Sequence, residues 1–324
     1  MRSNLVSRVF RSIGFPVTSA YRAGVIGHPI SHSLSPEIFT FLSVALNLPV
    51  LYQKIDCDPS QLGVQIQEAQ RQQKSQNPSP FIGLNVTLPH KESVLPWLSQ
   101  VSPEVTLIGA VNVIHFTQED SCGYNTDTQG VRETLREQEF QVHEKKALVF
   151  GAGGAAKAAI YTLAEMGIGH IVLCNRSRER AQKVCLKFSE TFPSTQFTIP
   201  DPDEISKLEQ EIDLCLNATP LGMMMGITGF NTGKGVLPSP TFFADLLPEL
   251  LKLLNPNALV FDMVYRPENT PFLQSASALG FKTVGGLDML VWQALATWEI
   301  WFGVIPNKQE LKQHLKSHLK KVMK

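Results

Sequence analysis

The chain has 324 residues, which predicts about two domains, and its 43% apolar residues suffice for a sizeable core. Lysine plus arginine and aspartate plus glutamate both number 29, so the charge balance does not point to nucleic acid or an anionic membrane as a partner. The five cysteines are scattered without CxxC spacing, which indicates reduced thiols and argues against a disulfide framework or a zinc site. No stretch predicts a membrane span, and we expect a cytoplasmic protein.

Residues 1–20 precede the first predicted strand, and we expect them to form a disordered extension. Arginines and serines without any acid are typical of an organelle transit peptide, which is one interpretation of this segment. The other two interpretations are a plain disordered extension and an upstream start codon. We favour these two, taken together, over a transit peptide.

Strand and helix signals alternate through the first part of the chain. A short strand at 23–27 is followed by a loop at 28–36 and a helix for which Ser35 is the expected N-cap, with Pro36 at the first helical position. The next predicted elements are a strand at 50–55, a helix at 62–73, a strand at 81–86, a helix at 92–98, a strand at 110–116 and a helix that opens at 123–127. This alternation predicts a mostly parallel sheet.

A second set of elements begins with a strand, a glycine turn and a helix at 146–167. Strands are then predicted at 170–174, 196–199, 214–217, 259–264 and 282–284, helices at 177–188, 205–210, 271–279 and 288–302, a glycine-rich loop at 226–235, and an amphipathic tail with leucines at 311, 315 and 319. We therefore expect an α/β protein of two domains with a cleft between them. Residues 21–127 plus 288–324 form the first domain, and residues 128–287 form a second domain of the Rossmann type.

The glycine turn at 151–154 has the pattern of a dinucleotide-binding unit. Its first glycine allows the turn, its second lets backbone approach a pyrophosphate, and a small residue, here Ala156, lets helix and strand pack. The pyrophosphate then lies on free N–H groups at the helix N-terminus. The pattern alone is weak evidence, because a purely structural turn has the same sequence.

The end of the second strand in this unit favours NADP over NAD. NAD enzymes usually place an acidic residue there to hold the ribose hydroxyls, whereas this chain has Asn-Arg-Ser-Arg-Glu-Arg at 175–180. Arg176 and Arg180, about one helical turn apart, can bracket a 2′-phosphate with charge-assisted hydrogen bonds. The alternative is a solvated basic helix start, but arginines are poorly placed at the positive end of a helix unless an anion neutralises them.

Two residues at strand-to-helix junctions are candidates for proton transfer. Lys91 follows Pro89 and His90, and Asp127 lies between the two halves of the chain. Hydride transfer to a ketone develops an alkoxide that must receive a proton, and a lysine ammonium held beside a carboxylate is a workable donor. Each residue also has an ordinary explanation, as a surface lysine and as a helix N-cap, and spacing alone does not bring the two together.

Ser33 and Ser35 lie two residues apart in a loop and present hydroxyls to one region, although Ser35 also fits as a helix cap. His28, His32 and His90 do not form a metal-binding set with any nearby acid, and we expect no metal. The two hydroxyls are therefore a candidate binding element for a small molecule.

Nine motifs in order resemble those of the shikimate dehydrogenase family, from about Tyr21 to the C-terminal helices. They are Gly27-His28-Pro29-Ile30 with Ser33-Leu34-Ser35-Pro36, Asn85-Val86-Thr87-Leu88-Pro89-His90-Lys91, Gly109-Ala110-Val111-Asn112, Asn125-Thr126-Asp127, Gly151-Ala152-Gly153-Gly154-Ala155, Asn175-Arg176-Ser177, Asn217-Ala218-Thr219-Pro220-Leu221-Gly222-Met223, Asp262-Met263-Val264-Tyr265 and Gly286-Leu287-Asp288-Met289-Leu290-Val291-Trp292-Gln293-Ala294. Such an ordered set is far more specific than one glycine turn.

The resemblance implies roles for the matching residues. Lys91 and Asp127 are the catalytic pair, with Lys91 as proton donor or acceptor at the reacting oxygen. The implied substrate ligands are Ser33 and Ser35 for the carboxylate, and Asn85, Thr87, Asn112 and Gln293 for the ring hydroxyls, with Tyr265 close by. The implied cofactor ligands are Gly151, Ala152, Gly153, Gly154, Ala155 and Ala156 at the pyrophosphate, Asn175, Arg176, Ser177 and Arg180 at the 2′-phosphate, and Thr219, Met263, Gly286 and Met289 at the nicotinamide.

The implied reaction is the reduction of 3-dehydroshikimate to shikimate with NADPH and without a metal, in aromatic amino acid and chorismate biosynthesis. The first domain then binds substrate, the second binds NADP, and the protein is a monomer or a homodimer. The chain departs from the family at His90, where an apolar or aromatic residue is frequent, and at Ser177, where threonine is frequent.

Two alternatives remain open. One is an enzyme that also uses quinate or prefers NAD, and the serine pair and the arginine cluster argue against it. The other is a non-catalytic NADP(H)-sensing protein, which the presence of both Lys91 and Asp127 disfavours.

Overall fold

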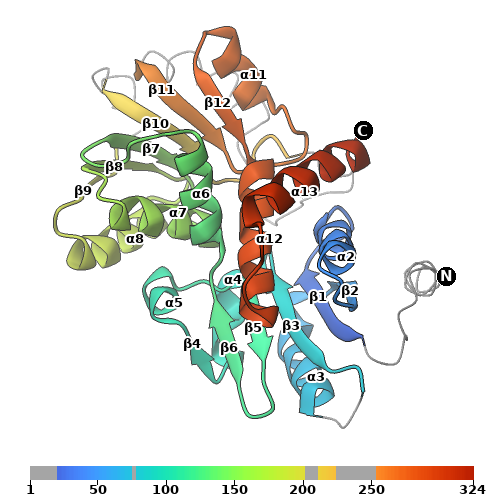
Figure 1. Cartoon of the computed structure of the whole chain (residues 1–324). Coiled ribbons are helices and arrows are strands. Elements are labelled where there is room, and N and C mark those ends of the chain that lie inside the picture. Colours follow the sequence, from blue (N-terminus) through green and yellow to red (C-terminus); the bar gives the residue numbers. More distant parts are fainter. Residues whose placement is uncertain (1–19, 75–77, 201–210, 224–252) are drawn as a thin grey trace. The chain divides into compact units, whose positions relative to one another are not determined.

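The computed structural model describes residues 20–74, 78–200, 211–223 and 253–324. The chain divides into two compact units, of which unit 2 is Asp127–Leu290 (Figure 1). Unit 1 comprises the described residues up to Thr126 together with Val291–Lys324, so it is built from two separate stretches of sequence. The extension before Ala20, the helix predicted at 205–210 and the loop predicted at 226–235 lie outside the described residues.

Unit 1 contains a six-stranded mixed sheet in the order β2-β1-β3-β5-β6-β4. The strands are β1 (Tyr21–Gly27), β2 (Val50–Asp56), β3 (Phe81–Val86), β4 (Gln100–Val101), β5 (Val113–Phe116) and β6 (Ser121–Tyr124). β1 is parallel to β2 and β3, and β4 is parallel to β6, whereas β5 is antiparallel to both of its neighbours.

The β5–β6 hairpin corrects the prediction that a helix opens at 123–127. Gly123 lies in β6, where an added Cβ would be 2.6 Å from Leu98 Cδ1, and the helix α6 begins only at Asp127. The turn is closed by the N–H of Thr117, which donates to Asp120 O at 2.8 Å, and by the N–H of Asp120, which donates to Thr117 Oγ1 at 2.9 Å. Its sequence has none of the glycine dipeptides that mark short hairpins, so the pattern gave no signal.

The helices of unit 1 cover both faces of this sheet. They are α2 (Ser35–Ala45), α3 (Leu62–Lys74), α4 (His90–Ser93), α5 (Pro103–Ile108) and α13 (Lys308–Val322), with the 3-10 turns η2 (Pro59–Gln61) and η3 (Leu95–Trp97), and most of α12 (Gly286–Phe302). β4 and α5 were not predicted, and the helix predicted at 92–98 is shorter and ends in η3.

Alternation along β3 gives the two faces of the sheet different chemistry. Leu84 and Val86 join an apolar cluster with Ile66 of α3, as expected for every second residue of a strand. Asn85 points to the other face, where its amide is hydrogen-bonded to Thr297 of α12. That second face is therefore the one on which polar side chains from the strands and from α12 meet.

Unit 2 contains a six-stranded, all-parallel sheet in the order β12-β11-β10-β7-β8-β9. The strands are β7 (Lys146–Phe150), β8 (His170–Cys174), β9 (Gln196–Thr198), β10 (Ile212–Asn217), β11 (Leu254–Asp262) and β12 (Lys282–Gly285), and the helices are α6 (Asp127–Glu137), α7 (Gly154–Glu165), α8 (Arg178–Thr191) and α11 (Pro271–Ala278). The inner strands β7, β8 and β10 and the second half of β11 are almost continuously buried, as in parallel sheets covered on both faces. The predicted fold class, α/β with a Rossmann-type unit, is confirmed.

Candidate active site

Ser33 and Ser35 lie at the start of α2, and Ser35 does not cap it. The residue at the N-cap position is Leu34, which makes no side-chain cap, and Ser35 is the first helical residue, so the predicted cap is wrong. The Ser33 hydroxyl donates to Ser35 Oγ at 3.2 Å and accepts from the Ser35 N–H at 3.3 Å. The Ser35 side chain also lowers the pKa of Tyr52, against the larger raising effect of burial, so it lies near that phenol.

Lys91 is the second residue of α4, which follows β3 after a turn of three residues. Its carbonyl oxygen accepts from the Val111 N–H at 2.7 Å, and the N–H of the preceding residue, His90, donates to Thr87 O at 2.8 Å. The fully buried His90 imidazole lies with Nε2 2.8 Å from Cys57 O, and burial lowers the His90 pKa, so the ring is neutral and Nε2–H donates. The turn that carries Lys91 is thereby fixed to two other segments of unit 1, at Cys57 and at Val111.

A connected group of polar side chains lies on the α12 side of this sheet. The Tyr52 hydroxyl donates to Asn85 Oδ1 at 2.7 Å, and Asn85 Nδ2 donates to Thr297 Oγ1 at 3.2 Å. Thr297 Oγ1 in turn lies 3.3 Å from Thr126 Oγ1. Burial raises the pKa of Tyr52 well above its ordinary value, so its hydroxyl stays protonated and acts as a donor.

Asn112 and Gln293 join the same group through Thr126. The Thr126 N–H donates to Asn112 Oδ1 at 2.7 Å, and Asn112 Nδ2 donates to Thr126 Oγ1 at 3.0 Å and to Gln293 Oε1 at 3.4 Å. Three of the four residues predicted to bind ring hydroxyls, Asn85, Asn112 and Gln293, are thus brought into one network. The fourth, Thr87, is half-buried just after β3, and its backbone N–H donates to Ile26 O at 3.0 Å.

Tyr52, Thr126 and Thr297 had been given no role from the sequence. Thr126 stood inside a recognised motif, between Asn125 and Asp127, and could have been singled out there. Tyr52 and Thr297 lie inside an ordinary strand and an ordinary apolar helix, and Thr297 is 212 residues from its partner Asn85. No local pattern signals such a contact.

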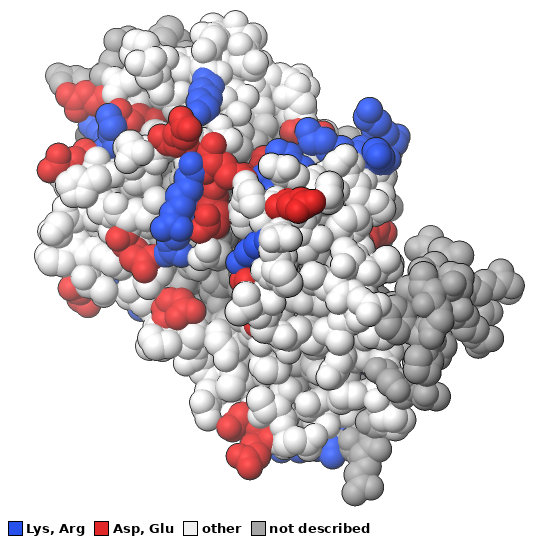
Figure 2. Space-filling model, in the orientation of Figure 1, with Lys and Arg blue, Asp and Glu red and all other residues white. Residues whose placement is uncertain are grey.

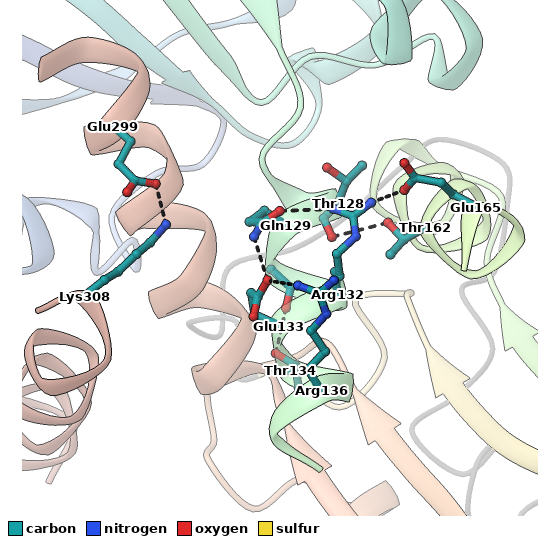
Figure 3. Close-up of polar contacts among 11 residues, drawn as sticks. Thr128, Gln129, Arg132, Glu133, Thr134, Arg136, Thr162, Glu165, Glu299 and Lys308 are labelled. Atoms are coloured by element: carbon teal, nitrogen blue, oxygen red, sulfur yellow. Dashed lines mark hydrogen bonds and ion pairs between the residues drawn. The ribbon is translucent and has the colours of Figure 1, made fainter. Parts of the chain in front are cut away.

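Asp127 is the first residue of α6 and is buried, with 5% of its surface exposed. Polar contacts along this helix are drawn in Figure 3. Arg132 forms an ion pair with Glu165 of α7, and the Thr162 hydroxyl donates to Thr128 O at 3.3 Å, so α6 is fixed against α7 beside its first turn. The separate ion pair between Lys308 and Glu299 joins α13 to α12 within unit 1.

The glycine turn of unit 2 has the geometry that its pattern predicts. Gly151 has a φ of +110°, in the region that favours glycine, and its N–H donates to Cys174 O at 2.9 Å. Gly153 precedes α7 with no side-chain cap, and a Cβ there would meet nothing within 4 Å. The helix N-terminus and the open space at Gly153 suit a phosphate group held by backbone N–H donors. Ala152 and Ala156 are buried, and Gly154 and Ala155 are half-buried in the first turn of α7.

The loop between β8 and α8 holds the predicted 2′-phosphate ligands. Ser177 is the N-cap of α8, and its hydroxyl accepts from the Arg180 N–H at 3.3 Å. Asn175 Nδ2 donates to Ser177 O at 2.9 Å, so the loop is braced by its own side chains. Arg176 and Arg180 are exposed, as the side chains that meet a charged ligand must be.

The segments after β10 and β11 are joined by a buried pair. Asn217 Nδ2 donates to Asp262 Oδ1 at 2.9 Å, and Asn217 Oδ1 accepts from the Thr219 hydroxyl at 2.7 Å. Asp262 also accepts from the Val264 N–H at 3.0 Å and from the Thr270 hydroxyl at 2.6 Å. Burial raises the pKa of Asp262 to about 6 despite these donors. Thr219, one of the predicted nicotinamide ligands, is therefore oriented by two residues whose role the sequence did not predict.

The other predicted nicotinamide ligands lie close to this pair in sequence or in space. Met263 directly follows Asp262 at the end of β11, and Gly286 lies against it, since a Cβ on Gly286 would be 2.2 Å from Met263 O. Met289 is buried one turn further along α12, and Tyr265 is half-buried two residues beyond Met263. These are positions at the carboxyl end of a parallel sheet, where open α/β sheets bind ligands.

Three further observations concern the described part of the chain. No helix there is long and apolar enough to cross a membrane. No group of three His, Cys, Asp or Glu side chains in those residues could hold a metal ion. On the face seen in Figure 2, acidic and basic side chains lie among one another, without a continuous patch of either sign.

An all-parallel unit with a glycine turn before α7, together with a unit that gathers hydroxyl and amide side chains on one face of a mixed sheet, is typical of a dinucleotide-dependent oxidoreductase of the α/β class. Three family models match the chain, namely the shikimate dehydrogenase substrate binding domain at residues 25–114, shikimate/quinate 5-dehydrogenase at 134–221 and the shikimate 5′-dehydrogenase C-terminal domain at 286–316. The chain belongs to the shikimate dehydrogenase family.

Relatives cover nearly the whole chain. The shikimate dehydrogenase (NADP(+)) of Geobacter sulfurreducens is 36% identical over 301 residues, which are 92% of this chain and 96% of that protein. A shikimate dehydrogenase solved in complex with NADP+ is 29% identical, with a TM-score of 0.76, over 96% of this chain and all of that one. Shikimate 5-dehydrogenase from Thermus thermophilus, solved with NADP(H) and shikimate, is 31% identical, with a TM-score of 0.72, over 92% and 99% of the two chains.

Proposed function

We propose that this protein is an NADP-dependent shikimate dehydrogenase that reduces 3-dehydroshikimate to shikimate. The observation that carries the proposal is the network of buried amides and hydroxyls around Asn85, Asn112 and Gln293, because a polyhydroxylated ring needs several fixed donors and acceptors. The curated relatives carry the same activity in their names.

The residues of unit 1 bind the substrate in this proposal. Ser33 and Ser35 donate their hydroxyls, and α2 its uncapped N-terminus, to the carboxylate. Asn85, Thr87, Asn112 and Gln293 bind the ring hydroxyls, and Tyr265 of unit 2 is a further substrate ligand that the family resemblance implies. This makes the first unit the substrate-binding one, and unit 2 the one that binds NADP.

The chemistry at the reacting carbon requires a hydride and a proton. NADPH, when bound, supplies the hydride. Lys91 Nζ donates a proton to the oxygen that develops negative charge, or removes it in the reverse direction, and Asp127 is the proposed carboxylate partner in this step. His90 keeps the Lys91 turn in place through its bond to Cys57 O.

Residues of unit 2 suit the cofactor. Residues 151–156 provide the uncapped helix N-terminus for the pyrophosphate, and Asn175, Arg176, Ser177 and Arg180 provide the charged loop for the 2′-phosphate. Thr219, Met263, Gly286 and Met289 line the nicotinamide side.

The substrate assignment is tested by following NADPH formation at 340 nm with four pairs, shikimate or quinate with NADP or NAD. We expect turnover with shikimate and NADP to exceed that with each other pair. Quinate is the second candidate, because the model matching residues 134–221 describes dehydrogenases of shikimate and quinate alike. Faster turnover with quinate, or no turnover with any pair, would contradict the proposal.

The role of Lys91 is tested by Lys91→Ala, with Lys74→Ala at the exposed end of α3 as the matched control. We expect Lys91→Ala to lose most of the turnover, since general acid–base catalysis contributes about 10²–10⁴-fold, while NADP binding is retained. Lys74→Ala should behave as the wild type. Wild-type turnover in Lys91→Ala would show that the catalytic assignment is wrong.

The 2′-phosphate assignment is tested by Arg176→Ala and Arg180→Ala, with Lys183→Ala further along α8 as the control. Loss of one charge-assisted hydrogen bond should raise KM for NADP about tenfold or more and leave KM for NAD unchanged. Equal changes for NADP and NAD would mean that these arginines do not contact the 2′-phosphate.

A further inference from the structure

The Thr297 hydroxyl lies at the centre of the polar network in unit 1, although no role follows for it from the motifs. The residue is fully buried in α12, one helical turn after Gln293. Its Oγ1 donates to Gln293 O at 2.9 Å, a bond that many helical threonines make to the carbonyl four residues before them. That bond alone would be a local feature of the helix.

Two further contacts distinguish Thr297 from such a local residue. Its Oγ1 accepts from Asn85 Nδ2 at 3.2 Å and lies 3.3 Å from Thr126 Oγ1. A hydroxyl has one hydrogen and two lone pairs, and here the hydrogen meets Gln293 O while the lone pairs face Asn85 and Thr126. Every hydrogen-bonding position of this hydroxyl therefore has a partner.

The orientation of the Asn85 amide depends on this arrangement. Asn85 Oδ1 accepts from the Tyr52 hydroxyl at 2.7 Å, and Nδ2 donates to Thr297. With its oxygen end and its nitrogen end each held by a different element, the amide cannot flip without breaking both bonds. Its second N–H hydrogen then has a fixed direction in which to meet a substrate hydroxyl.

Thr126 connects this arrangement to the other amides. Its N–H and Oγ1 bond to Asn112, and its Oγ1 lies 3.4 Å from Gln293 Oε1. The hydroxyl of Thr297 thus touches, directly or through one residue, all three amides that are proposed to bind ring hydroxyls.

We infer that Thr297 is a positioning residue for substrate recognition, whose hydroxyl sets the orientation of the Asn85 and Thr126 side chains toward the ring hydroxyls of the substrate. The inference rests on the proposed function for the identity of that substrate. If Thr297 has this role, removing its hydroxyl weakens substrate binding and leaves cofactor binding unchanged.

The variant that tests this is Thr297→Val, which keeps the shape of the side chain and removes the hydroxyl. Loss of the acceptor for a buried N–H should raise KM for shikimate about tenfold to a hundredfold, with a much smaller change in kcat and no change in KM for NADP. Thr297→Ser, which restores the hydroxyl, should return KM for shikimate to near the wild-type value. The matched control is Thr134→Val in α6, because Thr134 is equally buried and its hydroxyl donates to Gly130 O at 2.7 Å (Figure 3).

A readout that does not depend on activity is the hydrogen exchange of the Asn85 side-chain amide, followed by NMR of protein labelled with ¹⁵N-asparagine. We expect slow exchange in the wild type and in Thr134→Val, and faster exchange in Thr297→Val. If the wild type fails to oxidise shikimate, the proposed function fails, and this experiment still decides whether Thr297 orders Asn85.

Two results would overturn the inference. The first is a folded Thr297→Val protein with wild-type KM for shikimate and wild-type exchange of the Asn85 amide. That result would mean that the hydroxyl only makes its bond to Gln293 O within α12. The second is a rise in KM for shikimate that Thr297→Ser does not reverse, because the effect would then come from packing and not from the hydroxyl.

Discussion

Gly286 allows the start of α12 to lie against the end of β11, and Gly286→Ala tests how closely the two must approach. An alanine Cβ would lie 2.2 Å from Met263 O, 2.5 Å from Met263 C and 2.8 Å from Val264 C. All three atoms belong to the backbone, so no side-chain rotation can relieve the contact. The Gly286 N–H also donates to Val264 O at 3.1 Å, and a shift of the segments would strain that bond.

The expected cost lies at the upper end of the range for inserting atoms into a packed site, about 2–3 kcal/mol. The higher helix propensity of alanine offsets at most about 1 kcal/mol of this cost. A cost of about 2–3 kcal/mol, taken before that offset, lowers the midpoint of thermal unfolding by about 4–12 °C, because a protein unit of this size loses roughly 2–4 °C per kcal/mol. Because Met263 is a proposed nicotinamide ligand, KM for NADP should rise as well.

The assay is differential scanning calorimetry with steady-state kinetics, and Gly153→Ala is the matched control. Gly153 has a φ of −88° and free space around the added Cβ, so only a weaker helix cap is lost, for about 1 kcal/mol or less. That variant should unfold near the wild-type temperature while binding NADP less tightly, because its Cβ would meet the pyrophosphate. A Gly286→Ala protein with the wild-type unfolding temperature would refute the reasoning.

Three further predictions concern stability. Because burial raises the pKa of Asp262 to about 6, the folded state keeps a proton that the unfolded chain loses near pH 4, and this group makes stability fall as pH rises between those values. Asp262→Asn removes that fall. The free energy of unfolding of the variant minus that of the wild type, measured with urea, should therefore increase by up to about 3 kcal/mol from pH 4 to pH 7. The same difference at both pH values would argue against ionisation of a buried Asp262. Ser177→Ala removes the cap of α8 and should lower the free energy of unfolding by about 1 kcal/mol, whereas a loss of zero would mean that the cap is not formed in solution. Phe39 is 1% exposed; its ring stacks on that of Tyr52 with the centroids 4.3 Å apart, and it lies tilted against Trp301 with the centroids 5.2 Å apart. Phe39→Ala should therefore cost about 3–5 kcal/mol in denaturant unfolding, and a cost below about 1 kcal/mol would contradict this packing.

The glycine turn and the basic loop could be predicted from the sequence because their signals are local. Gly151 needs a positive φ, which favours glycine. Arg176 and Arg180 lie at a helix start, where positive charge is unfavourable unless an anion neutralises it. The fold class followed in the same way from alternating strand and helix patterns.

The polar network of unit 1 could not be predicted in this way. It depends on which face of β3 carries Asn85 and on which residue of α12 meets it, and those are properties of tertiary packing. Ser35 shows the same limit, since a serine before Pro36 is a good helix cap by local rules, yet it is the first helical residue and its hydroxyl accepts from that of Ser33. The β5–β6 hairpin was missed because Thr117 and Asp120 close its turn without glycine.

The order of residues along the chain has a consequence for how this protein folds during synthesis. Unit 2 is one continuous stretch, whereas unit 1 needs Val291–Lys324, and the Trp301 indole of that last stretch donates to Ile114 O of β5 at 3.1 Å. At a synthesis rate of about 5–20 residues per second, the unfinished sheet of unit 1 waits on the order of 10–30 s while unit 2 is made. The half of the protein that leaves the ribosome first is therefore completed last, and during that interval the sheet face that later receives α12 is open to chaperones.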